Sequence, residues 1–201
     1  KMVSSVYHAI GASRQIFIQA PTGVGKTMST IFPAVRAVGE GKGETIFYLT
    51  AKTITRTVAQ EAFEVLREKG MKYKVVTITA KEKLCFMDET KCDPVHCPYA
   101  RGHFDRVNDA VYELWTTKSR YDRETIREQA EKWQVCPFEM CLDLSVWVDA
   151  VICDYNYVFD PNVYLKRFFA EGIRGDYIFL VDEAHNLVER SREMYSAEIY
   201  K

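Results

Sequence analysis

The feature that most constrains the fold is a glycine-rich segment, Ala20-Pro-Thr-Gly-Val-Gly-Lys-Thr27, between a short apolar run and a helical pattern. Glycines let the backbone curl so that several N–H groups point at one centre, and the next helix adds its positive N-terminal end. A loop that leaves a strand and enters a helix in this way cradles phosphate groups. We therefore predict a nucleotide-binding loop made of Pro21, Thr22, Gly23, Val24, Gly25, Lys26 and Thr27.

Two side chains of this loop have distinct expected roles. Lys26 would reach the β- and γ-phosphates of ATP, and the Thr27 hydroxyl would bind Mg²⁺. Ala20 stands where this pattern usually has its first glycine. The alternative interpretation is a glycine-rich turn with a surface lysine.

Around the loop, short β-branched and aromatic runs alternate with longer helical patterns, which favours an α/β fold with a parallel sheet and helices on both faces. The predicted strands lie at 15–19, 45–50, 73–79, 150–153 and 177–181. The predicted helices lie at 2–10, 26–38, 53–69, 101–115, 123–133, 136–147 and 162–170. The alternation breaks at 81–147, so we expect a core of residues 1–80 and 148–201 interrupted by a mainly helical insertion.

Acidic residues follow the last apolar run, as Asp182-Glu183-Ala184-His185-Asn186. Carboxylates at the end of a buried strand are costly unless they serve cations or water, and this edge of an α/β sheet is where ligands bind. We expect Asp182 to hold Mg²⁺ through water and Glu183 to orient and deprotonate the attacking water. We expect His185 to couple this site to the rest of the protein. The alternatives are an Asp-Glu pair that caps a helix and a histidine that only packs.

Five of the six cysteines fall within residues 85–141. No secretory leader is visible, which disfavours structural disulfides. Thiolates at Cys-x4-Cys spacing suit either an iron–sulfur cluster or zinc, and His96 or His103 could complete a zinc site. From the residues alone, iron–sulfur, zinc and neither stay open, and Cys136 with Cys141 is also a plausible ligand pair.

The chain resembles the XPD and DinG family of superfamily-two DNA helicases. The resemblance covers nearly the whole chain and is carried by the phosphate loop, by Tyr48-Leu-Thr-Ala-Lys-Thr53, by Asp149–Pro161 and by the DEAH-like Val181–Asn186. It implies a RecA-like ATP-binding domain interrupted by an iron–sulfur insertion, with ATP, Mg²⁺ and a 4Fe–4S cluster as cofactors. The implied activity is ATP-dependent DNA unwinding, 5′ to 3′, in a context such as DNA repair.

The resemblance also implies roles for individual residues. It implies that the cluster ligands are Cys85, Cys92, Cys97 and Cys136, which leaves Cys141 and Cys153 without a cluster role. It implies DNA contacts for Lys52, Thr53, Arg56, Tyr155 and Asn156, although packing is the alternative for the tyrosine. The charged helices at 101–133 carry seven basic and seven acidic residues, a balance typical of a solvated face.

The remaining expectations concern the whole protein. The longest apolar run, Tyr177–Val181, is too short to span a membrane, so we expect no membrane partner and a cytoplasmic or nuclear location. The expected partner is single-stranded DNA or a DNA junction, and the expected state is monomeric. We expect the chain to be a fragment that lacks the second motor domain. The alternative function is a nucleic-acid-binding or redox-sensing metal module whose ATP site does not drive unwinding.

Overall fold

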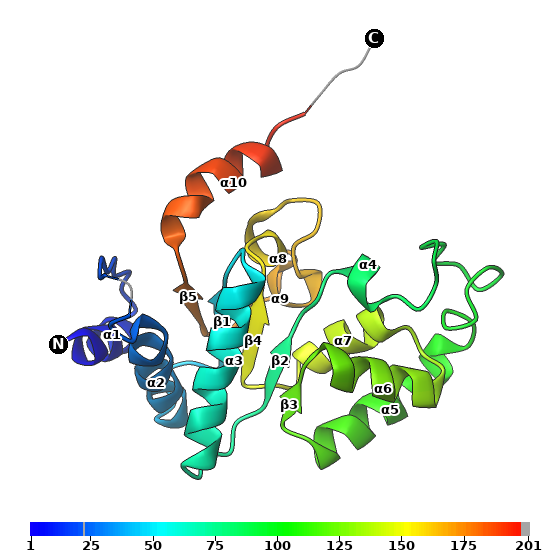
Figure 1. The fold of residues 1–201 in the computed structure, drawn as a ribbon, viewed down its shortest axis with the longest axis horizontal. Coiled ribbons are helices and arrows are strands. Elements are labelled where there is room, and N and C mark those ends of the chain that lie inside the picture. The colour runs from blue at the N-terminus through cyan, green and yellow to red at the C-terminus, as the bar shows by residue number, and fades with distance from the viewer. Residues whose placement is uncertain (22, 198–201) are drawn as a thin grey trace. The chain divides into compact units, whose positions relative to one another are not determined.

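The computed structural model describes residues 1–21 and 23–197, so Thr22 of the predicted phosphate loop lies outside the described residues. Five short strands form one sheet in the order β3-β2-β4-β1-β5 (Figure 1). β1 runs parallel to β5, with Thr45 opposite Tyr177, and β2 runs parallel to β3. The strands are β1 (Thr45–Leu49), β2 (Val75–Thr77), β3 (Arg120–Tyr121), β4 (Ala150–Cys153) and β5 (Tyr177–Val181).

Helices occupy most of the remaining chain, which confirms the α/β fold class. Within the described residues, no helix combines the length and the apolarity needed to cross a membrane. The longer helices are α1 (Met2–Gly11), α2 (Lys26–Gly39), α3 (Thr53–Glu68), α5 (His103–Thr117), α6 (Arg123–Trp133), α7 (Pro137–Ser145) and α10 (Leu187–Met194). The short ones are α4 (Lys81–Leu84), α8 (Asn156–Phe159), α9 (Lys166–Phe169) and a 3₁₀ turn at Ala184–Asn186.

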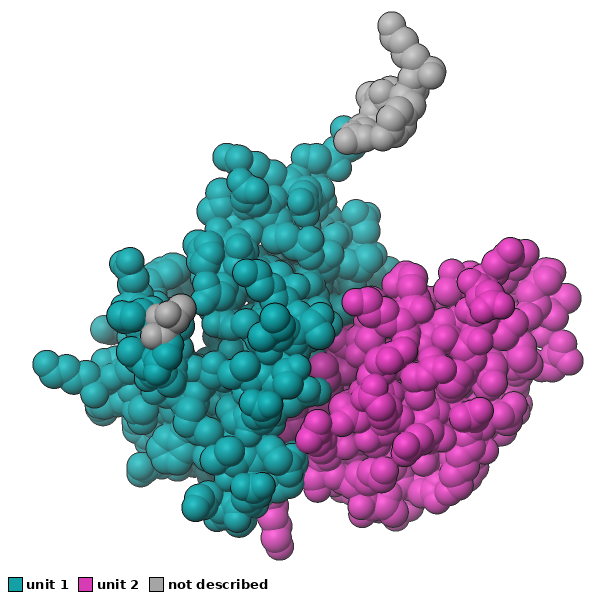
Figure 2. Space-filling model, viewed as in Figure 1, with its two compact units in different colours: residues 1–71, 152–201 teal, residues 72–151 magenta. Residues whose placement is uncertain are grey.

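The chain divides into two compact units, one of residues 1–71 and 152–201 and one of residues 72–151 (Figure 2). In the first unit, the strand residues Ile46 to Leu49 are buried, as expected for a strand rich in aromatic and β-branched residues. The second unit packs α5, α6 and α7 against one another and includes β2 and β3. The predicted boundaries of the insertion, 81 and 147, stay a prediction.

The predicted strand at 15–19 is wrong in this structure. Residues 14–21 adopt no helix or strand, and Phe17 is 90% exposed. A strand needs a neighbour for its hydrogen bonds, and none of the described strands pairs with this segment. The apolar run Ile16–Ile18 was therefore insufficient evidence for a strand without a pairing partner.

The predicted helix at 162–170 is only partly present. α9 covers Lys166–Phe169, and an unpredicted short helix, α8, comes before it. Pro161 cannot donate a backbone hydrogen bond and separates the two pieces. Phe168 is buried and packs edge-on against Phe47 of β1, so packing rather than helical periodicity holds this segment.

Candidate functional site

The carboxyl ends of β1, β4 and β5 meet at one edge of the sheet. The backbone N–H of Asp182 donates to the carbonyl of Leu49 at 2.9 Å, and that of Thr50 donates to Cys153 at 3.0 Å. The residues that follow each strand are therefore neighbours. In parallel sheets this edge carries the ligand site.

The phosphate loop leads into this edge through two glycines in left-handed backbone conformations. Gly23 has a φ of 82° and Gly25 a φ of 73°, values that side-chain-bearing residues rarely adopt. Gly25 directly precedes α2, so Lys26 and Thr27 lie in the first helical turn. Helix N-terminal N–H groups and the lysine side chain are thus available to a phosphate.

Lys26 and Glu183 are brought together although 157 positions separate them. The Lys26 ammonium lies 3.2 Å from Glu183 Oε1, and both side chains are about one-third exposed, at 31% and 34%. The hydrogen bond from Lys26 lowers the pKa of the Glu183 carboxyl, and burial opposes this effect only in part. Glu183 itself has a φ of 50°, a strained conformation for a residue with a side chain.

Tyr48 is a site residue that the sequence did not reveal. Its ring is 2% exposed on β1, and its hydroxyl forms hydrogen bonds with Thr27 and with Asp182. Burial is the main cause that raises the pKa of Asp182, while the Tyr48 hydrogen bond opposes the rise. Tyr48 therefore links the two residues predicted to hold Mg²⁺.

Tyr155 corrects one predicted DNA contact. Its side chain is fully buried, and its hydroxyl donates to the backbone carbonyls of Asp182 and Glu183. A ring enclosed in this way cannot stack on a base, so the prediction is wrong for this residue. His185, in contrast, is 74% exposed, with Nδ1 3.5 Å from Glu183 Oε2.

The other predicted DNA residues differ in how exposed their side chains are and in the contacts that those side chains make. Lys52 and Thr53 are exposed at the start of α3. Arg56 forms an ion pair with Asp154 at 3.4 Å, and its side chain is only 18% exposed. The Asn156 side-chain oxygen accepts a hydrogen bond from Arg190 at 2.8 Å, and Arg190 also pairs with Asp154 at 3.0 Å.

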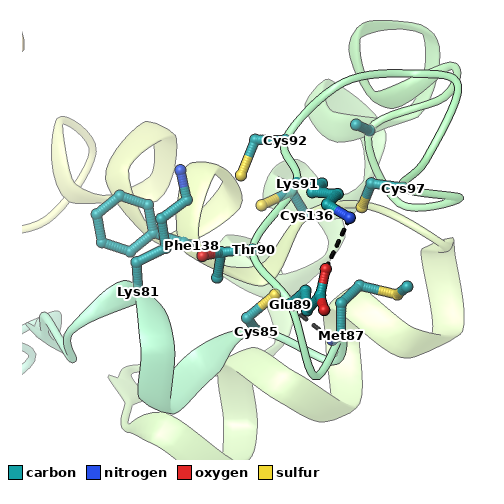
Figure 3. Close-up of a pocket in the computed structure, with 11 residues that line it drawn as sticks. Lys81, Cys85, Met87, Glu89, Thr90, Lys91, Cys92, Cys97, Cys136 and Phe138 are labelled. Atoms are coloured by element: carbon teal, nitrogen blue, oxygen red, sulfur yellow. Dashed lines mark hydrogen bonds and ion pairs between the residues drawn. The ribbon is translucent and has the colours of Figure 1, made fainter.

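In the second unit, the four cysteines predicted as cluster ligands line one small cavity of about 30 Å³ (Figure 3). Cys141 and Cys153 do not line it, because both are fully buried elsewhere. Burial raises the pKa of both thiols, that of Cys141 to about 12. The cavity is lined by Lys81, Cys85, Met87, Glu89, Thr90, Lys91, Cys92, Cys97, Ala100, Cys136 and Phe138.

Polar groups face the sulfur atoms of this cavity. The Met87 N–H donates to the sulfur of Cys85 at 3.4 Å. Burial raises the pKa of the Cys136 thiol, although backbone N–H groups at the start of α7 act in the opposite direction. Lys81 lies with its ammonium 5.5 Å from the centroid of the Phe138 ring. Burial lowers the pKa of Lys81, but a hydrogen bond and charge interaction with Cys92 outweigh it, so the net shift is upward.

Comparisons with solved structures support the same architecture. A structure titled Truncated XPD superposes with a TM-score of 0.65 at 18% identity, over 93% of this chain and 52% of that chain. A second, titled XPD helicase, gives a TM-score of 0.64 at 18% identity, over 94% of this chain and 32% of that chain. The chain therefore has the RecA-like helicase fold of these proteins.

Curated relatives are longer proteins of which the chain spans a minor part. The Fanconi anemia group J protein homolog of Gallus gallus is 30% identical over 104 residues, which is 51% of this chain and 8% of the relative. A probable ATP-dependent helicase of Methanocaldococcus jannaschii is 23% identical over 190 residues, 93% of this chain and 28% of the relative.

Family models cover the chain in two overlapping parts. One described as DEAD/DEAH box helicase matches residues 2–99, which include the phosphate loop and the start of α3. One described as DEAD_2 matches residues 66–201, which include every cysteine and the acidic edge of β5. Because the second match covers most of the sequence, the chain belongs to the DEAD_2 helicase family.

Proposed function

We propose that this chain forms the ATP-binding part of an ATP-dependent DNA helicase. One observation carries the proposal: Lys26 and Thr27 of the phosphate loop meet Asp182 and Glu183 at a single edge of the sheet. A cation, a hydroxyl and two carboxylates with separate environments are the groups that phosphoryl transfer to water requires. The name of one curated relative, a probable ATP-dependent helicase, agrees with this activity.

The ion pair between Lys26 and Glu183 indicates how nucleotide binding prepares the site. In the structure, Lys26 stabilises the charged carboxylate and keeps the pKa of Glu183 low. A nucleotide in the loop offers its phosphates to Lys26 instead. Release from the lysine raises the proton affinity of Glu183, which makes it a better base for the attacking water.

The magnesium ion that accompanies ATP would be held by Thr27 and, through water, by Asp182; when bound, it neutralises charge that develops on the phosphates. These residues fit the ion because oxygen donors are its preferred ligands. Tyr48 interacts with both side chains and so links them. Tyr155 supports the same turn through hydrogen bonds to the carbonyls of Asp182 and Glu183.

The proposed partner is single-stranded DNA, on the exposed start of α3. Lys52 supplies a cation and Thr53 a hydroxyl at the N-terminal end of a 16-residue helix, where N–H groups attract phosphate. Asn156 and Arg56 can join this surface only if they leave their contacts with Arg190 and Asp154. We therefore place the primary phosphate contact at Lys52 and Thr53.

Equilibrium ATP binding in the presence of Mg²⁺ tests the nucleotide site. Glu183→Gln keeps the size of the side chain but removes the charge that engages Lys26, so ATP should bind at least as tightly as to the original chain. Hydrolysis should fall, because an amide cannot accept the proton of water. Loss of ATP binding in Glu183→Gln would show that the ion pair is structural and that the proposed role is wrong.

We also propose that Cys85, Cys92, Cys97 and Cys136 bind a 4Fe–4S cluster. The support is that these four thiols, and neither of the other two cysteines, line one cavity. Among the described residues, no group of three or more His, Cys, Asp or Glu side chains is placed to hold a single metal ion. That arrangement does not oppose a cluster, because the cubane spreads its four thiolates over separate iron atoms, whereas zinc draws all its ligands to about 2.3 Å from one centre.

Iron and acid-labile sulfide analysis of anaerobically prepared protein, with a visible spectrum, tests the cluster. We expect iron and sulfide together with broad visible absorption. Stoichiometric zinc without iron would contradict the cluster and favour a zinc site in the same cavity.

A further inference from the structure

The loops that carry the four cluster cysteines have little regular structure of their own. α4 contains four residues, and residues 85–102, between α4 and α5, form no helix or strand. Backbone carbonyls outside helices and sheets still need hydrogen-bond donors when they are not in water. Arginine side chains of α5 and α6 supply many of these donors.

The first cysteine loop is held from α6. Arg127 Nη1 donates to the carbonyl oxygens of Leu84 at 2.6 Å and of Cys85 at 3.2 Å. One turn earlier, Arg123 Nε donates to the carbonyl of Lys83 at 3.0 Å. Three consecutive carbonyls that end at the first cysteine are thus bound by two guanidinium groups of one helix.

The last cysteine loop is held from the first turn of α5. Arg106 Nε donates to the carbonyl of Trp133 at 3.0 Å, and its Nη2 donates to that of Gln134 at 2.6 Å. The His103 ring completes this contact, because its Nδ1 accepts the backbone N–H of Cys136 at 3.2 Å. The segment that delivers Cys136 is therefore fixed by two side chains of α5.

We propose that Arg106 and Arg127 are positioning residues that hold Cys136 and Cys85 ready to receive the cluster. The inference rests on the proposed iron–sulfur site. A guanidinium stays charged at all relevant pH values and offers several donors in a rigid plane, which suits it to fixing adjacent carbonyls. Its positive charge also favours a cluster whose four thiolates give it a net negative charge.

The test uses Arg106→Met and Arg127→Met in the complete chain, because methionine keeps an apolar stem of similar length and removes the donors. Lys118→Met is the matched control, since Lys118 at the end of α5 pairs with the exposed Glu128 at 3.8 Å rather than with a cysteine loop. Arg127→Lys retains the positive charge but lacks the planar set of guanidinium donors. It replaces Arg127→Met if the methionine variant does not fold.

Two readouts are needed. The first is hydrogen exchange in the iron-free protein, where the amides of residues 84–87 in Arg127→Met and 134–136 in Arg106→Met should exchange roughly tenfold faster than in the original chain. The second is the rate at which a chelator bleaches the loaded protein, which should rise by a similar factor. Lys118→Met should match the original chain in both, and Arg127→Lys should fall between the original chain and Arg127→Met.

The outcomes separate this inference from the proposal on which it rests. If the original chain takes up no iron, the cluster proposal fails, whatever the exchange rates show. If it takes up iron but both arginine-to-methionine variants match the Lys118→Met control in exchange and bleaching, the arginines are not positioning residues. Faster exchange confined to the predicted segments, together with faster bleaching, supports the inference.

Discussion

The nucleotide edge and the cysteine cavity position their side chains by different means. At the nucleotide edge, Lys26 follows a left-handed glycine at a helix start, and Asp182 follows a strand whose neighbour accepts its N–H. At the cavity, Cys85 and Cys136 stand in loops that arginine side chains hold by their carbonyls. Regular hydrogen-bond ladders thus fix the first site, whereas individual side-chain contacts fix the second, so single substitutions should affect the two differently.

The largest expected effect tests the edge directly. Lys26→Ala should reduce ATP binding and turnover by about 10²–10³-fold, because no other described side chain of the loop replaces its charge on the phosphates. The fold should persist, since Lys26 is one-third exposed and its ion pair with Glu183 contributes little to stability. Isothermal titration measures ATP binding, release of inorganic phosphate measures turnover, and a thermal unfolding curve measures the stability of the fold.

A second lysine controls for general charge effects. Lys42 pairs with Glu40 beyond the end of α2, so Lys42→Ala should leave ATP binding unchanged. Wild-type turnover in Lys26→Ala would overturn the assignment of the phosphate loop.

The cysteine cavity should respond to single substitutions by losing its cluster. A Ser substitution at Cys85, Cys92, Cys97 or Cys136 should remove the visible absorption while the first unit stays folded. Cys141→Ser should keep the absorption and cost about 1–3 kcal/mol, because it buries a hydroxyl in the core. If Cys141→Ser bleaches the protein and Cys92→Ser does not, the ligand set is wrong.

The sequence was informative where chemistry follows directly from a regular element. Lys26, Asp182 and Glu183 were predicted from a loop and a strand end, and the structure brings them together. Tyr48 was missed because an aromatic residue in a strand is typical of the hydrophobic core and does not by itself indicate a site. Its hydroxyl function depends on Thr27, whose distance from β1 only the fold determines.

The failures have a shared physical cause: each depended on contacts distant in sequence. The run Ile16–Ile18 has strand-like composition but no pairing partner in the described sheet. Tyr155 follows a strand, as a DNA contact would, yet burial turns its hydroxyl to the acidic turn. Arg106 and Arg127 were assigned to a solvated face because their acceptors are backbone carbonyls. Every residue has such a carbonyl, so the sequence does not indicate which ones an arginine binds.

A smaller expected effect concerns Tyr155 and distinguishes a packing role from a role in holding the acidic turn at the nucleotide edge. Tyr155→Phe removes the donor to the carbonyls of Asp182 and Glu183 and should lower the free energy of unfolding by about 1–3 kcal/mol. ATP affinity should fall as well, because Asp182, which is proposed to hold Mg²⁺ through water, lies in the turn that loses this support. Urea denaturation and ATP titration measure both. Unchanged affinity with lowered stability would confine Tyr155 to packing.

The smallest expected effect is a weaker response of the nucleotide edge than of α5 and α6 to acid. Hydrogen bonds from Lys132, Trp133 and Gln129 lower the pKa of Glu113 from 4.5 to about 2. A carboxyl whose pKa is lowered by folding stabilises the fold above its ordinary pKa, and this contribution is lost as the pH falls from about 4.5 towards 2. At the nucleotide edge, burial raises the pKa of Asp182, so its protonation in acid relieves the cost of its buried charge and offsets part of the stabilisation lost as Glu183 is protonated.

Between pH 4.5 and 2, amides of α5 and α6 should therefore lose protection from hydrogen exchange before those of β1 and β5. Glu113→Gln should abolish most of this difference, since an amide does not titrate. Added salt should weaken it, because the pair of Glu113 and Lys132 is exposed to solvent. Earlier opening of β1 and β5, or an unchanged acid response in Glu113→Gln, would show that side-chain contacts do not limit the stability of the cysteine-bearing unit.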